Sequence, residues 1–214
     1  MAVVAAVDLY SGFGIDSARM VLLLACTLFQ VFCSSSGEWS TAAKQQALSI
    51  ARESVRAAVL GQAPPALPKR LLPPLRGRSG VFVTLSVNGR TRGCMGSLFP
   101  SAANLAEEIA SAASMAATTD PYHKPIRPQE LPLLQISLNV VKGRPWIARS
   151  ISELRPAHLG LCVQSSRGGV VLPGEARTAS WQLKMAKLKA GVPSNQPVQM
   201  LVFKTVSISE SRIR

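Results

Sequence analysis

Residues 80–98 read GVFVTLSVNGRTRGCMGSL, which is two strand-like runs joined by Asn88-Gly89. The first run places valine or leucine at every second position, as in a strand with one face in a core. The Asn-Gly pair predicts a type I′ turn, because both central residues of that turn need positive φ. The sequence therefore predicts an antiparallel hairpin, with strands at 80–87 and from Arg90 to about Leu98.

The turn also sets a register, because cross-strand partners share a face of the sheet. Val83 should face Cys94 and Leu85 should face Arg92, unless a bulge at a neighbouring glycine shifts the pairing. On a core-facing side, Arg92 would need a carboxylate, carbonyl groups or an anionic ligand as its partner. A guanidinium beside a thiol would also lower the pKa of Cys94.

The return strand carries RGCMGS at 92–97, which combines a guanidinium, a thiol and a hydroxyl with two glycines. Glycines at such positions allow a backbone or a ligand to approach closely. We predict a site here, in which Cys94 is a nucleophile or a thiol ligand. The alternative for Cys94 is a small buried hydrophobe, the commonest role of a free cysteine. The residues predicted to bind an anionic ligand are Arg92, Gly93, Gly96 and Ser97.

Asp120 and His123 could complete such a site. Asp120 would orient Arg92 and contact the ligand, and the alternative is a turn residue before Pro121. His123 would be a general base, although we favour the alternative that it is a loop residue. No histidine adjoins Cys94 in the sequence, so a Cys–His pair would have to form in the fold.

The rest of the chain shows helical and strand patterns without strict βαβ alternation. Prolines in a connector at 61–78 exclude regular helix or central strand there, and four further prolines mark a loop at 120–132. Together with one antiparallel hairpin, this predicts an α+β fold with a mainly antiparallel sheet flanked by helices. Helices are expected at 41–60, 104–117 and 178–190, and further strands at 134–140, 159–164, 169–172 and 198–207.

The 214-residue chain has a formal net charge of +13, distributed unevenly. Residues 38–214 hold 23 basic and 9 acidic side chains, whereas residues 1–37 hold one basic and two acidic side chains. We therefore expect a leader at 1–37 and one folded domain at 38–214. The positive excess favours an anionic partner, such as nucleic acid, an acidic membrane or an acidic protein, although it also serves solubility.

The leader contains a 13-residue apolar run from Val21 to Cys33. This run is short for a bilayer and suits the core of a signal peptide, which would make the protein exported or membrane-tethered. The alternative is a mis-assigned start codon and a cytoplasmic protein. We favour the cytoplasmic alternative, since nothing downstream is typical of secretion, and we expect no stable membrane association of the folded domain.

Four cysteines, Cys26, Cys33, Cys94 and Cys162, form no C-x-x-C pair. Their spacing fits neither a disulfide framework nor a zinc site. The chain also holds only two histidines, which disfavours a histidine-rich metal site. We therefore expect no metal and no cofactor.

The stretch TRGCMGS at 91–97 resembles L-R-G-C-I-G-[ST], the most distinctive motif of the AMMECR family, also named AmmeMemoRadiSam system protein A. The chain departs from the family at Tyr122-His123, where Arg-Phe is usual, and at Lys187, where cysteine is usual. Family-like segments cover nearly all of the domain. They are 48–52, 80–85, Asp120-Pro121, Glu130-Leu131-Pro132, Leu172-Pro173 and Lys189-Ala190-Gly191.

The resemblance implies an α+β unit of two closely associated subdomains around an antiparallel sheet. The family's activity is not settled. Its bacterial and archaeal members are associated with a Memo-like protein and a radical-SAM protein. We therefore expect a component of such a modification system, either a catalyst or small-ligand protein with its site at 92–97, or an adaptor without catalysis of its own.

A basic nucleic-acid-binding module, for RNA in particular, is a further alternative. Its candidate residues are Lys69, Arg70, Arg76, Arg78, Lys184, Lys187 and Lys189, of which Lys184 and Lys187 can share a helix face. A solvated surface explains such residues more often. Aromatic residues make up only 5% of the chain, which argues against a surface for stacking bases.

Overall fold

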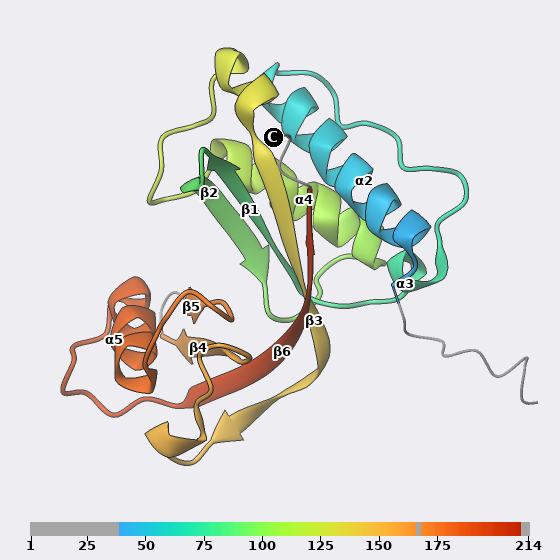
Figure 1. Ribbon diagram of the computed structural model, residues 1–214. Coiled ribbons are helices and arrows are strands. Elements are labelled where there is room, and N and C mark those ends of the chain that lie inside the picture. The colour runs from blue at the N-terminus through green and yellow to red at the C-terminus, as the bar shows by residue number, and fades with distance from the viewer. Residues whose placement is uncertain (1–38, 166–167, 211–214) are drawn as a thin grey trace, which may run out of the picture. The chain divides into compact units, whose positions relative to one another are not determined.

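The computed structural model describes residues 39–165 and 168–210, whose arrangement is shown in Figure 1. The expected leader at 1–37, with its apolar run from Val21 to Cys33, lies outside the described residues. So do residues 166–167 and 211–214. Among the helices of the described part, none combines the length and apolar content that crossing a membrane requires.

The predicted hairpin is present as β1, Val81–Val87, and β2, Arg90–Ser97, which pair antiparallel. Asn88 and Gly89 have φ angles of 49° and 76°, as a type I′ turn requires. The hairpin and its turn are therefore confirmed.

The register beyond the turn differs from the prediction, because a β-bulge intervenes. Gly93 lies opposite Leu85 and Cys94 opposite Thr84, which leaves Arg92 as the extra residue of the bulge. One inserted residue moves the side chains beyond it to the other face of the sheet. The expectation that Cys94 shares a face with Val83 is therefore wrong, and Cys94 lies on the same face as Thr84.

The sheet has six strands in the order β2-β1-β3-β6-β4-β5, and all pairs are antiparallel. This confirms the α+β class with a mainly antiparallel sheet. β3 continues beyond the predicted 134–140, because a bulge between Lys142 and Trp146 lets it bend and keep pairing with β6. The remaining strands are β3, Gln135–Ala148, β4, Gly160–Gln164, β5, Gly168–Val171, and β6, Met200–Ser209.

The three predicted long helices are α2, Thr41–Val59, α4, Leu105–Thr118, and α5, Ala179–Ala190. Each begins after a residue whose side chain accepts a hydrogen bond from a first-turn backbone N–H, and these residues are Ser40, Asn104 and Thr178. In Figure 1, α2 and α4 lie beside the half of the sheet that contains β1 and β2, and α5 lies beside β4 and β5.

The proline-rich segments contain short helices as well. They are α3, Pro73–Arg76, and the 3₁₀ helices η1, Pro128–Leu133, and η2, Ile151–Glu153. The expectation that prolines exclude helix from 61–78 is therefore wrong for one turn. Pro73 occupies the start of α3, where a helix needs no N–H donor.

Buried side chains form three clusters that follow the two faces of the sheet. On the helix-covered face, one cluster packs β1 and β3 against α2 and α4, and a second packs β4 and β5 against α5. These two regions are the closely associated subdomains implied by the resemblance. The third, hereafter the inner cluster, lies on the opposite face and comprises Phe82, Leu98, Val141, Cys162, Leu172 and Phe203.

Candidate functional site

Arg92, at the bulge, is held by a carboxylate from a distant segment. Its Nε and Nη2 donate to the two carboxylate oxygens of Glu130 at 2.7 and 3.1 Å. Glu130 belongs to η1 and also accepts the Arg127 backbone N–H at 3.0 Å. The hydrogen bond from Arg92, followed by that from the Arg127 backbone, lowers the pKa of Glu130 to about 2. The bulge therefore holds the guanidinium of Arg92 in a fixed orientation. Its partner is a carboxylate, which is one of the partners expected from the sequence.

Asp120 does not orient Arg92, contrary to the first part of its prediction. Its carboxylate accepts hydrogen bonds from the backbone N–H groups of Cys94 at 2.6 Å and Tyr122 at 2.7 Å, and from His123 Nδ1 at 3.0 Å. The side chain is only 3% exposed. Asp120 thus joins β2 to the loop after α4, and Glu130 is the residue that orients Arg92.

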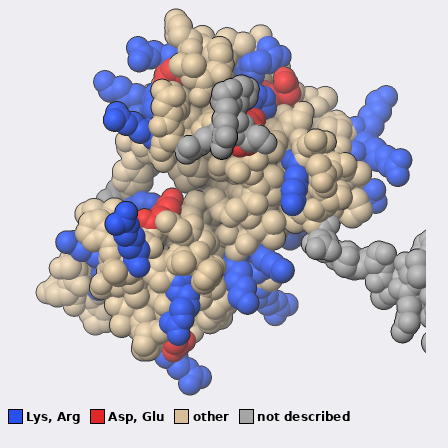
Figure 2. Space-filling view, in the orientation of Figure 1, with Lys and Arg blue, Asp and Glu red and all other residues tan. Residues whose placement is uncertain are grey.

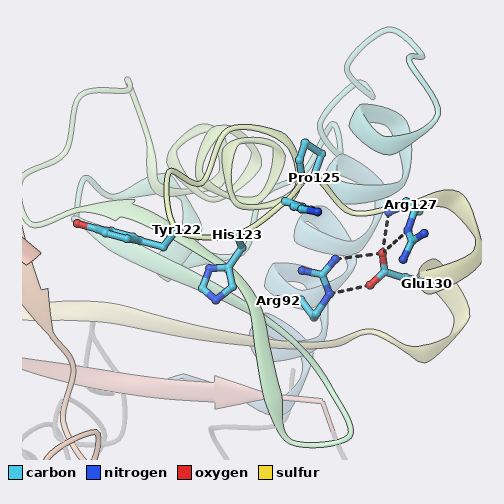
Figure 3. A pocket seen from close by; sticks show the side chains of 7 residues that line it. Arg92, Tyr122, His123, Pro125, Arg127 and Glu130 are labelled. Carbon is cyan, nitrogen blue, oxygen red and sulfur yellow. Dashed lines mark hydrogen bonds and ion pairs between the residues drawn. The ribbon is translucent and has the colours of Figure 1, made fainter.

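An open pocket of about 500 Å³ lies beside the bulge. Figure 3 shows the guanidinium of Arg92 between the ring of His123 and the carboxylate of Glu130. Three cationic side chains and one carboxylate line the pocket, which gives it an excess of positive charge. The lining residues are Arg92, Tyr122, His123, Lys124, Pro125, Arg127 and Glu130.

His123 is oriented within this pocket by Asp120. A carboxylate only accepts hydrogen bonds, so the network assigns the hydrogen of the neutral imidazole to Nδ1. Nε2 then keeps its lone pair and is available to a ligand. The loop position of His123 agrees with the interpretation favoured from the sequence, and its ring lines the pocket.

Cys94 lies in different surroundings. Its Sγ is 3.3 Å from Thr84 Oγ1, and the side chain packs against the inner cluster. Burial raises the pKa of Cys94, and the hydrogen bond with Thr84 opposes this rise only in part. The expected lowering of its pKa by Arg92 is therefore wrong. Cys94 is also not among the residues that line the pocket.

The two glycines of the motif lie where neighbouring backbone leaves no room for a side chain. A Cβ on Gly93 would come within 2.0 Å of the backbone oxygen of Ala116 in α4, and one on Gly96 within 2.0 Å of the backbone oxygen of Val81. Ser97 closes the turn after β2, with its hydroxyl hydrogen-bonded to the backbone of Phe99. None of these three residues lines the pocket, so among the described residues only Arg92 of the predicted ligand-binding group does.

The positions that depart from the family pattern have separate locations. Tyr122 lines the pocket, and its hydroxyl donates to the backbone oxygen of Lys189 at 2.9 Å. Lys187 is buried, and its Nζ donates to the backbone oxygens of Ser194 and Gln196 at 2.8 and 2.7 Å. Lys187 therefore does not share an exposed helix face with Lys184, contrary to the expectation for a basic surface.

Sequence reasoning missed Glu130, Lys124 and Arg127 as site residues. One pattern could have drawn attention to Glu130, because an acidic residue three positions after Arg127 can bond back to the backbone there, as in a capping box. Within residues 39–165 and 168–210, no group of three or more His, Cys, Asp or Glu side chains is placed to hold a metal ion.

Residues 48–208 match the AMMECR1 family, and the chain therefore belongs to this family. The recognition made from the motif at 91–97 is confirmed. An uncharacterised protein of Pyrococcus horikoshii has the same fold in its crystal structure, with a TM-score of 0.66. It is 22% identical, and the match covers 75% of this chain and 88% of that chain.

Three sequence relatives come from bacteria and archaea, and their names state no activity. A protein of Thermotoga maritima is 42% identical over 120 residues, which are 54% of this chain and 68% of that protein. A protein of Methanothermobacter thermautotrophicus is 32% identical and covers 68% of this chain and 81% of its own length. A protein of Clostridium acetobutylicum is 31% identical over 78% of this chain, which spans only 36% of that relative.

Proposed function

We propose that this AMMECR1-family domain binds the anionic group of a small ligand at Arg92, as a component of a modification system with a Memo-like protein and a radical-SAM protein. The observation that supports the binding site is the pocket beside the bulge, where three cations accompany one carboxylate. The partners are those implied by the family resemblance, and Arg92 belongs to the motif on which that resemblance rests.

The guanidinium of Arg92 is held in a fixed orientation before a ligand binds. Glu130 binds Nε and Nη2, which leaves Nη1 without a protein acceptor in the described part of the chain. A planar guanidinium binds carboxylates and phosphates in a fixed geometry. Because Glu130 already restrains the side chain, a ligand does not have to order it, and this favours binding.

His123 gives this site a group that can move a proton. A ligand anchored at Arg92 would lie beside the imidazole, whose Nδ1 is occupied by Asp120. Nε2 could then accept a proton from the ligand or from a bound water as a general base. Cys94 has no part in this proposal, because its thiol packs against the inner cluster.

The ligand site can be tested by titrating the protein with inorganic phosphate and with malonate, using nuclear magnetic resonance shifts of the pocket amides. We expect Arg92→Gln to weaken binding by about tenfold. Arg90→Gln removes an exposed arginine of the same strand that does not line the pocket, and it should bind as the wild type does. Equal affinities in the two variants would refute the site. If Arg92→Gln does not fold, Lys124→Gln tests the same cationic lining.

The proposed membership of this protein in a modification system is tested by a separate experiment. Purified Memo-like and radical-SAM proteins from the same genome should bind this protein in a surface-based binding assay. A lack of binding by both proteins would remove the partners from the proposal and leave the ligand site untouched.

A further inference from the structure

β3 and β6 carry two lysines directly opposite each other. Lys142 pairs with Lys204 in the antiparallel register, and both side chains are exposed. The pairs on either side of them along the strands, Val140 with Val206 and Trp146 with Val202, have members in the two helix-covered clusters. The lysines therefore lie on the helix-covered face of the sheet, at a place between the two clusters where no helix covers them.

This pairing is unfavourable for the protein alone. Like charges directly opposite each other destabilise an antiparallel pair of strands. Arg144, in the bulge after Lys142, adds a third exposed cation. None of the ion pairs among the described residues involves these three side chains. An anionic ligand would relieve the repulsion that the protein leaves uncompensated.

An exposed aromatic side chain adjoins the cations. Trp146 is opposite Val202, which is two residues from Lys204 on the same face of β6, and it is 38% exposed. The bulge turns β3 here, and Gly143 within it has a φ of 71°. Figure 2 shows basic side chains, in blue, over the bend of β3 and β6.

We propose that this bend, defined by Lys142, Arg144, Trp146 and Lys204, binds single-stranded nucleic acid. Clustered cations bind phosphates, and an exposed indole stacks on a base. An acidic peptide would use the cations but would have no matching use for the indole. Of the four residues that define the bend, only Trp146 is aromatic, so the stacking contact is short. The site is separate from the pocket at Arg92 and does not depend on the function proposed there.

The test of the cations compares two double variants with the same change in net charge. The double variant Lys142→Glu with Lys204→Glu reverses two charges at the bend. Lys44→Glu with Lys69→Glu alters exposed lysines of α2 and of the connector, which form no ion pair among the described residues. The probe is a short fluorescein-labelled poly(U) strand, and binding is measured by fluorescence anisotropy at several salt concentrations. We expect at least about tenfold weaker binding and a shallower salt dependence for the first variant only, since each phosphate contact contributes a slope of about 0.7.

The test of the indole uses Trp146→Ala and Trp146→Phe. We expect Trp146→Ala to weaken binding by roughly tenfold with an unchanged salt dependence, and Trp146→Phe to restore most of the affinity. Equal losses in the two double variants, or no loss with Trp146→Ala, would overturn the proposal. Binding of anionic vesicles or of poly-glutamate without binding of poly(U) would also overturn it, in favour of a membrane or an acidic protein.

Discussion

The backbone N–H of Cys94 donates to the carboxylate of Asp120 at 2.6 Å, which joins edge strand β2 to the loop that follows α4. The same carboxylate binds His123 Nδ1 at 3.0 Å. One buried acidic side chain therefore connects the motif at 92–97 to the pocket lining. Asp120 binds the backbone of the motif, while its charged side chain, Arg92, is held by Glu130.

Asp120→Asn should destabilise the fold by about 1–3 kcal/mol, because an amide has one acceptor oxygen where the carboxylate has two that bind three donors. Urea denaturation at neutral pH measures this loss. Hydrogen exchange identifies its location, since the amides of Cys94 and Tyr122 should exchange faster while those of α2 do not. Unchanged exchange at Cys94 would contradict the role given to Asp120.

Glu130→Gln should destabilise the protein by about 1–3 kcal/mol at neutral pH, and this difference should vanish in acid. The folded-state pKa of Glu130 is about 2, below its ordinary value of 4.5. The carboxylate therefore stabilises the fold above pH 4.5, and this contribution is lost as the pH falls towards 2. Denaturation of both proteins across this range is the measurement.

The control for Glu130→Gln is Glu53→Gln, which breaks an ion pair with Arg56 on the surface of α2. Both of its partners are about half exposed, so the expected cost is below about 0.5 kcal/mol at any pH. A pH dependence as large for the control as for Glu130→Gln would argue that general acid unfolding, and not the Arg92 pair, causes the effect.

Gly93→Ala should destabilise the protein by more than about 2 kcal/mol, because its Cβ would lie within 2.0 Å of the Ala116 backbone oxygen. Backbone atoms cannot move aside as a flexible side chain can, so α4 would have to shift. Gly168→Ala is the matched control, since a Cβ there meets no atom within 4 Å. Similar melting temperatures for the two variants would show that α4 accommodates the added methyl group.

Local patterns were sufficient for most of the fold. Asn88-Gly89 specified the turn, and alternating apolar residues specified β1 and the first half of β3. These features depend on neighbours in the sequence. The far half of β3 was missed because Lys142, Gly143, Arg144 and Pro145 interrupt the alternation, and its pairing with β6 is a long-range interaction.

The site was only partly predictable, because it too depends on interactions between residues far apart in the sequence. The sequence indicated that Arg92 needs an anionic partner, but Glu130 lies 38 residues away in a 3₁₀ helix that proline content had hidden. The bulge at Arg92 also has no unique sequence pattern, because either neighbouring glycine could have carried it. Its consequence is large, since it moves Cys94 from the face of the valines to the inner cluster.

Cys94 should react with iodoacetamide much more slowly at neutral pH than an ordinary free thiol. Burial raises its pKa, so the reactive thiolate is scarce, and the side chain also packs against apolar residues. Mass spectrometry of the Cys94 peptide gives the rate, and the urea-unfolded protein supplies the reference. If Cys94 in the folded protein is alkylated as fast as in the urea-unfolded protein, its thiol is accessible and reactive, and Cys94 is again a candidate nucleophile.

Lys204→Glu should raise the stability of the isolated protein by a few tenths of a kcal/mol, up to about 1 kcal/mol. The substitution replaces a like-charge pair with an opposite-charge pair, because Lys204 lies directly opposite Lys142. Thermal unfolding at low salt measures the gain, which added salt should reduce because both side chains are exposed. Lys44→Glu, on α2, makes the same charge change away from Lys142 and tests whether lower net charge alone explains the gain. An equal gain in both variants would mean that the cross-strand repulsion is negligible, whereas a gain for Lys204→Glu alone shows that the fold retains an unfavourable pair at the bend.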